Sequence, residues 1–298
     1  MLMSVTAPAQ VGNRYSATAN VGKVRNRGIE LSLEHRNTVT KDFHYSVGGN
    51  ISFIDNELTA LNGGSPIYTN YQQVQVVDEG YPLYYFHGYD YLGVYQSDEE
   101  ALEYLTGYDA TTIPFHKGDA KYRDANGDGK IDDLDRVDLG SSIPKINYGL
   151  NLGAYYRDFD LQLFFQGVAG NKIYNQMRHR LEGDGSTSVL SPVMTDAWTK
   201  DNPDGSIPNP RNSVNYYVSN RFLESGSYFR LKNLQIGYSL PKSLIAKAGF
   251  ENCRFYIQGS NLFTLTNYKG FDPEVNGGVD YGNYPQSRTY MIGVNITY

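Results

Sequence analysis

The segment with the clearest chemistry is an acidic, glycine-containing stretch, DANGDGKIDDLD, at residues 124–135. Its spacing follows a calcium-binding EF-hand loop, in which the ligands alternate along the chain and a glycine at position six allows a sharp turn. Gly129 stands at that position. A hard cation takes several oxygen ligands from such a turn. We therefore expect the loop to hold Ca²⁺ through Asp124, Asn126, Asp128, the carbonyl of Lys130, Asp132 and Asp135.

Two features of this acidic loop limit the calcium prediction. Asp135 occupies the position of the usual bidentate Glu, and its shorter side chain predicts weaker binding. No long amphipathic helices flank the loop, so we expect it to rigidify a long connection and not to act as a sensor. The alternative is a turn without metal, in which Asp, Asn and Gly serve only the backbone geometry.

Aromatic residues in polar, irregular segments form a second set of candidates. Their rings stack on the apolar faces of sugars or on peptide side chains, and they equally pack one loop against another. The residues for which we expect ligand contact are Tyr216, Tyr217, Tyr268, Tyr281 and Tyr284, with Phe271 as a further candidate.

Sequence signatures of catalysis and of nucleic-acid binding are absent. The five histidines have no metal-ligand spacing, and no GxSxG or HExxH motif occurs. A net charge of −6 and a pI near 5.4 leave no basic stripe for a phosphate backbone. The single cysteine, Cys253, gives no disulfide framework. We expect neither an enzyme nor a nucleic-acid-binding protein.

The elements that must position these residues are predicted to be strands. The 27 Tyr and 31 Gly favour strands and turns over helical bundles. No run approaches the roughly 20 apolar residues that a transmembrane helix needs. The mean hydropathy of −0.49 remains compatible with a transmembrane barrel, because alternate residues of each strand face a polar lumen.

Strict alternation of apolar and polar residues marks the individual strands. It runs through residues 29–34, 43–53, 148–156, 159–166, 234–240 and 255–259, and more weakly through 65–78 and 81–96. The last strand is the clearest, and its apolar face is expected to form the barrel-terminal signal with Tyr290, Ile292, Val294, Ile296 and Tyr298. The total is about nine strands, each of the length that a tilted membrane-spanning strand requires.

Connection lengths indicate how these strands are arranged. Short links are expected near residues 37–41, 79–80, 157–158 and 241–250, and they alternate with long ones near 57–64, 97–145, 169–226 and 265–287. Outer-membrane barrels have short periplasmic turns and long extracellular loops. If Tyr298 ends on the periplasmic side, every short link falls on that side. An odd strand count predicts that part of the barrel lies outside this chain. A soluble β-sandwich or jelly roll is the alternative fold.

Four stretches, taken together and in order, resemble one known family. They are NVGKVRNRGIELSLEHRN (20–37), GDAKYRDANGDGKIDDLDRVDLGSSIPKINYGLNLGAYYRDFDLQLFFQGVAGNKIYN (118–175), SYFRLKNLQIGYSLPKSL (227–244) and GSNLFTLTNYKGFDPEV (259–275). They resemble the C-terminal barrel region of SusC/RagA-type TonB-linked outer-membrane proteins, which are TonB-dependent receptors of Bacteroidetes. The stretch AWTKDNPDGSIPNP, which contains Trp198, also resembles a loop of this family. This resemblance implies a structural role for Trp198.

The resemblance implies that residues 1–298 are the C-terminal portion of an all-β, antiparallel transmembrane barrel of about 22 strands, placed in the bacterial outer membrane. It implies TonB-energised uptake of glycan oligosaccharides or peptides, with a SusD-like surface lipoprotein as partner and outer-membrane lipid around the barrel. The TonB–ExbB–ExbD system would act through an N-terminal half, because the family's signal peptide, TonB box and plug are absent from this chain. The alternative function is a surface or secreted carbohydrate-binding β-protein without transport activity.

Overall fold

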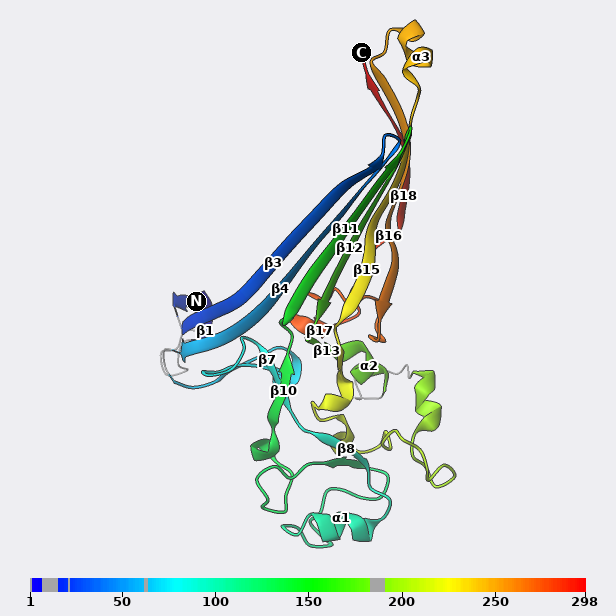
Figure 1. Ribbon diagram of the computed structural model, residues 1–298. Coiled ribbons are helices and arrows are strands. Elements are labelled where there is room, and N and C mark those ends of the chain that lie inside the picture. Colours follow the sequence, from blue (N-terminus) through cyan, green and yellow to red (C-terminus); the bar gives the residue numbers. More distant parts are fainter. Residues whose placement is uncertain (1, 7–15, 21, 62–63, 183–190) are drawn as a thin grey trace.

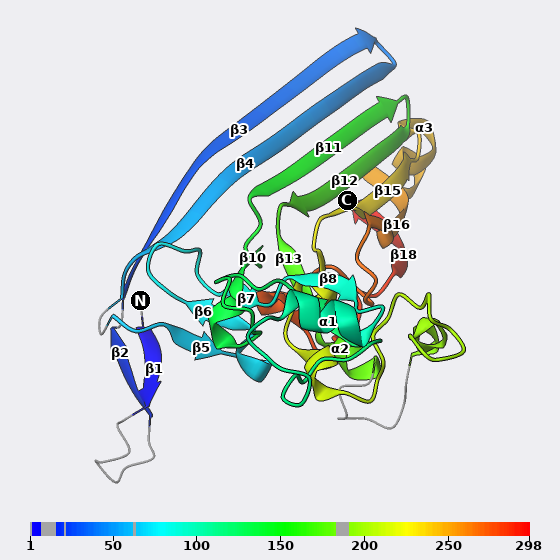
Figure 2. The ribbon, with the colours of Figure 1, turned by 90° about the horizontal axis from the view of Figure 1, so that it is seen from below.

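The computed structural model describes residues 2–6, 16–20, 22–61, 64–182 and 191–298. Its main feature is a seven-stranded antiparallel sheet, called the wall below, in which strands that are neighbours along the chain pair directly. Figures 1 and 2 show the wall as a curved layer that is open between its two edge strands, β3 and β18. The wall strands are β3 (Gly22–Thr40), β4 (Phe43–Leu61), β11 (Ile146–Tyr156), β12 (Phe159–Ala169), β15 (Tyr228–Ser239), β16 (Asn252–Thr266) and β18 (Thr289–Thr297).

The register of the wall brings the alternating residues of all its strands into continuous rows. Side chains of successive strand residues point to opposite faces. From β4 to β18, one row is apolar and contains, in pairing order, Tyr45, Ala154, Leu161, Ile236, Ile257 and Ile292. The row beside it lies on the other face and from β4 to β16 contains Ser46, Gly153, Gln162, Gln235 and Gln258. The wall therefore has one apolar face and one polar face, as the sequence predicted.

The apolar face of the wall is uncovered by protein in the described part of the chain. Ile292 is 85% exposed, Ile29 is 71% exposed and Ile257 is 52% exposed. Aromatic residues occupy both ends of this face, in the row Phe43, Tyr156, Phe159, Tyr238, Phe255 and in the contact group Tyr148, Phe165, Phe229, Phe263. Aromatic belts at both ends of an apolar band are typical of membrane-spanning barrels.

The connections between wall strands sort by length, as predicted. Residues 41–42, 157–158 and 240–251 make the short connections at the end of the wall where the C-terminus lies (Figure 1), and the last of them contains α3 (Lys242–Ile245). Residues 62–145, 170–227 and 267–288 make the long connections at the opposite end. The described parts of these long connections are called the loop assembly below.

The two weak strand predictions, at 65–78 and 81–96, are wrong as wall strands. These residues form β5 (Ile67–Thr69), β6 (Gln75–Val77), β7 (Tyr85–Gly88) and β8 (Tyr91–Val94), which belong to small sheets of the loop assembly with β10 (Val137–Ser141) and β9 (Ala120–Tyr122). All three residues of β6 are buried, so its two faces are covered by protein. The wall accordingly has seven strands instead of about nine, and residues 79–80 form a turn inside one long connection.

The two largest hydrophobic clusters of the described chain lie in the loop assembly, and a small third one packs Leu58 and Leu61 of β4 against Val77. The largest cluster is built around Tyr95, Leu105, Phe115 and Tyr122, and the second one around Phe86, Tyr174 and Phe222. The remaining elements are β1 (Leu2–Thr6), β2 (Ser16–Asn20), α1 (Asp98–Tyr104), β13 (Lys172–Asn175), α2 (Gln176–Leu181), β14 (Leu223–Ser225) and β17 (Val279–Asp280).

Within the residues that the structure describes, none of the helices has the length and apolar character needed to span a membrane.

Candidate functional site

The polar face of the wall carries a salt bridge that crosses an entire strand. Arg254 on β16 donates from Nε and Nη2 to the two carboxylate oxygens of Asp160 on β12, at 2.8 and 2.5 Å. The strand between them, β15, has Gly237 at this row, and a Cβ there would lie 2.3 Å from Asp160 Oδ1. Gly237 is therefore needed to let the bridge pass. Bidentate geometry makes this one of the stronger pairs on the face.

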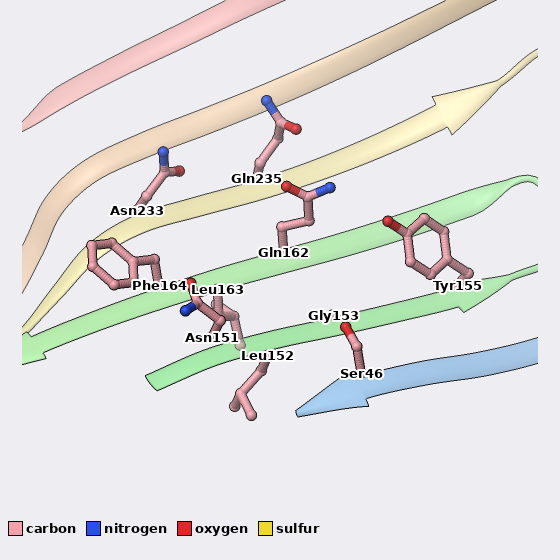
Figure 3. A pocket seen from close by; sticks show the side chains of 10 residues that line it. All are labelled: Ser46, Asn151, Leu152, Gly153, Tyr155, Gln162, Leu163, Phe164, Asn233 and Gln235. Atoms are coloured by element: carbon pink, nitrogen blue, oxygen red, sulfur yellow. The ribbon is translucent and has the colours of Figure 1, made fainter. Parts of the chain in front are cut away.

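Amides extend this polar network along the wall. Arg254 Nη2 also donates to Gln235 Oε1 at 2.9 Å, and Gln235 Nε2 donates to Gln258 Oε1 at 3.1 Å. Beside them lies a hollow of about 320 Å³, shown in Figure 3, where Tyr155, Gln162 and Gln235 project from neighbouring strands. Asp160 and Gln162 therefore belong to a connected polar part of this face.

Other polar residues of this face make separate contacts. Glu34 accepts a hydrogen bond from Arg36 on the same strand at 2.7 Å, and Gln166 Nε2 lies 3.5 Å from the Tyr228 hydroxyl. Glu30 is exposed on β3. These residues add polar groups to this face at three further positions.

A buried ion cluster fastens the connection 267–288 to the wall. Arg230 on β15 is 2% exposed and donates to Asp272, to Glu274 and to the Thr264 hydroxyl at 2.8, 2.8 and 2.7 Å. Burial opposes ionisation of Asp272, but the backbone amides of Glu274 and Gln286 and the Arg230 guanidinium together hold its pKa below the usual value. The connection is thus tied to the wall by paired charges. Sequence reasoning missed this cluster because its partners lie far apart along the chain.

The acidic loop at 124–135 uses its carboxylates to hold its own backbone. Asp124 accepts two backbone N–H groups at 2.7 and 2.8 Å, and Asp135, which is 1% exposed, accepts two others at 2.8 Å each. The remaining predicted ligands, Asn126, Asp128, Lys130 and Asp132, are exposed. Among the described residues, no group of three His, Cys, Asp or Glu side chains is arranged to hold a metal. The calcium site stays a prediction.

The aromatic candidates have different surroundings. Tyr216 and Tyr268 are 7% and 6% exposed, and the Tyr268 hydroxyl donates to Asp280 Oδ2 at 2.5 Å. Burial and that carboxylate raise the pKa of Tyr268. Tyr281 is 43% exposed and Tyr284 is 89% exposed. Tyr216 and Tyr217 line a hollow of the loop assembly. Ligand contact by these residues stays a prediction.

Two further aromatic candidates can be placed. Phe271 is 68% exposed and lines a different hollow, beside Lys269 and Asp280. Trp198 is 7% exposed and covers Gly118, where a Cβ would lie 2.2 Å from the indole. The structural role expected for Trp198 agrees with this packing.

Three features define part of an antiparallel β-barrel with a folded loop assembly at one end. Strands that follow one another along the chain pair directly, the sheet has one apolar and one polar face, and short and long connections lie at opposite ends. No protein-family model matches the chain. It is similar to TonB-dependent receptor P3 of Formosa agariphila, with 33% identity over 95% of this chain and 30% of the receptor. It is also similar to TonB-dependent receptor SusC of Bacteroides thetaiotaomicron, with 27% identity over 100% of this chain and 29% of SusC.

Solved structures give the same result. The RagAB peptide transporter superposes with a TM-score of 0.82 and 28% identity, over 99% of this chain and 32% of the matched chain. The chain is therefore homologous to TonB-dependent receptors of the SusC and RagA type, and it spans about a third of the length of the relatives that it matches. The resemblance inferred from the sequence blocks is confirmed.

Proposed function

We propose that this chain is the C-terminal portion of an outer-membrane importer that takes up glycan oligosaccharides or peptides with energy from TonB. The observation that carries the proposal is the two-faced wall. Its apolar face is exposed with aromatic belts at both ends, while its opposite face is polar and holds the network around Arg254. A lipid-facing outside and a hydrated inside are what a barrel transporter needs.

The two ends of the wall have different roles in this proposal. The short connections face the periplasm, and the loop assembly lies outside the cell, where it meets the solute. A SusD-like surface lipoprotein is the proposed partner on that side. The TonB–ExbB–ExbD system would act through a part of the receptor that precedes the wall. Support comes from the homology to SusC and to the RagAB peptide transporter.

Uptake in whole cells tests the proposal. Cells that carry the receptor are given a fluorescent oligosaccharide mixture or a fluorescent peptide mixture, and matched cells lack TonB. We expect internal fluorescence from one of the two mixtures, and its loss without TonB. Fractionation of the same cells should place the protein with outer-membrane lipid.

The alternative, a carbohydrate-binding surface protein without transport, makes the opposite prediction. Such a protein would bind glycan in TonB-deficient cells as well as in the parent, and it would remain a folded monomer in plain buffer. The exposed apolar face predicts aggregation without lipid or detergent instead.

A further inference from the structure

A hollow of about 400 Å³ lies between two long connections of the loop assembly. The connection 62–145 contributes Gln72, Tyr89, Asp133 and Arg136 to its lining, and the connection 170–227 contributes Ser213, Tyr216, Tyr217 and Val218. All eight belong to the described part of the chain. The lining residues fall into three chemical groups, which together indicate the chemistry of a ligand.

Tyrosine rings that line the hollow are packed against other rings. The rings of Tyr89 and Tyr217 stack at 5.0 Å between centroids, and Tyr217 also stacks on Tyr122 at 5.6 Å. Tyr122 is fully buried, and its hydroxyl donates to the Val214 carbonyl at 2.9 Å. Burial raises the pKa of Tyr217 and of Tyr89, and Asp133 raises that of Tyr89 further. Both hydroxyls are thus neutral groups that can donate and accept hydrogen bonds.

The lining also carries a charge pair, Arg136 and Asp133. Arg136 Nη2 donates to the carbonyls of Gln73 and His87, both at 3.0 Å, which fixes the guanidinium. Its side chain is 10% exposed, and its Nε is buried without a hydrogen-bond partner in the described structure. Asp133 lies 4.0 Å from Nη1 and is 92% exposed. The pair offers donors and an acceptor side by side.

A strained turn supplies the remaining polar group. Asn70, Gln72 and Gln73 all have left-handed backbones, with φ of 65°, 50° and 58°. Three non-glycine residues in this region within one short turn are costly, and strain of this kind collects at ligand-binding segments. The turn brings Gln72 to the lining of the hollow, and Arg136 holds its end through the Gln73 carbonyl.

We propose that this hollow binds one sugar ring of a neutral oligosaccharide. Sugar hydroxyls both donate and accept, as do the amide, the phenols and the charge pair that face them, and the apolar C–H groups of a sugar fit against aromatic rings. Asp133 and Arg136 supply one charge of each sign, so the lining has no formal net charge that would favour an acidic or a basic ligand. The proposal rests on the proposed import function and names its substrate class.

Binding of hexasaccharides to the whole receptor in detergent tests the proposal. Isothermal titration uses maltohexaose, laminarihexaose, cellohexaose and a neutral hexapeptide as probes. The variants are Gln72→Gly, which suits the left-handed backbone, Asp133→Ala at an exposed position and Tyr217→Phe, which keeps the ring. Tyr284→Phe is the matched control, because this tyrosine is 89% exposed and lies outside the hollow lining.

We expect one hexasaccharide to bind and each of the three variants to weaken it by about three- to tenfold, the worth of one hydrogen bond, with the control unchanged. Equal affinity in all variants would overturn the proposal and leave the import function standing. Hexapeptide binding that the same variants weaken would make the hollow a peptide site and overturn the sugar assignment. If no probe binds the wild-type receptor, the sugar assignment is overturned, and the uptake experiment with TonB-deficient cells tests the import function separately.

Discussion

The wall and the loop assembly differ in where they place their apolar side chains. In the wall, apolar side chains such as Ile292 and Ile257 are exposed, and backbone pairing to neighbouring strands provides the order. In the loop assembly, Tyr95, Phe115 and Tyr122 are buried in an ordinary hydrophobic core. A sheet that exposes its apolar face needs an apolar solvent, whereas the loop assembly supplies its own interior. The difference indicates that the wall is completed by lipid and the loop assembly by its own packing.

The buried ion cluster links the two regions through paired charges, and we expect its removal to have the largest effect. Arg230→Ala leaves Asp272 and Glu274 without their main cation, and we expect a loss of about 3–5 kcal/mol of stability. Urea unfolding in detergent, with proteolysis of the connection 267–288, measures it. Lys232→Ala is the control: this ammonium lies 3.3 Å from Glu274 but is 30% exposed, so we expect about 1 kcal/mol or less. Equal losses of stability in the Arg230→Ala and Lys232→Ala variants would contradict a specific role of Arg230 in this link.

Backbone geometry in the acidic loop gives a smaller, paired effect. Gly129 and Gly127 both have a φ of 78°, but a Cβ at Gly129 would lie 2.5 Å from the Gly107 nitrogen, whereas a Cβ at Gly127 has nothing within 4 Å. Gly129→Ala should therefore cost about 2–3 kcal/mol and Gly127→Ala about 1 kcal/mol. Hydrogen exchange of the backbone amides over residues 120–136 measures the loss of local stability in each variant. Similar protection in the two variants would show that the loop does not pack on Gly107.

The pH dependence of the link follows from Asp272, whose pKa is lowered in the folded state. A lowered folded pKa contributes stability that is present above the unfolded pKa, near 3.8, and that is lost as the pH falls through the folded pKa. We expect the connection 267–288 to become sensitive to pepsin only below about pH 4. Asp272→Asn should remove this pH dependence. Release of the wild-type connection at neutral pH would contradict the assignment.

Calcium should have the smallest effect, because Asp124 and Asp135 already bond the backbone of the loop. We expect metal analysis of the purified receptor to find bound Ca²⁺ that is lost in the double variant Asp124→Asn with Asp128→Asn. A modest increase in loop exchange should accompany its removal by chelator, since bound metal stabilises the folded form. Unchanged metal content in the double variant would remove the calcium prediction.

The sequence predicted the strands of the wall better than the structure of the loop assembly. The wall strands could be predicted because lipid on one side and water on the other impose a period of two, seen from Tyr290 to Tyr298. In the loop assembly, β6 is buried on both faces, so its pattern has no such period. Contacts such as that of Arg230 with Asp272 join distant segments, and no local spacing encodes them. Of the five tyrosines predicted to contact a ligand, Tyr216 and Tyr217 line the hollow proposed to bind a sugar. Arg136 lines the same hollow, but it is distant in sequence and was not predicted.

The measurement that tests the central claim most directly compares two adjacent residues of β16. A nitroxide is attached to Ile257→Cys or to Gln258→Cys, in a receptor with Cys253→Ser and no other cysteine, reconstituted in lipid vesicles. Ile257 lies in the apolar row and Gln258 in the polar row at the same depth. We predict that the label at 257 collides with oxygen dissolved in lipid, and the label at 258 with a water-soluble nickel chelate. Equal nickel access at both positions would contradict a lipid-facing wall.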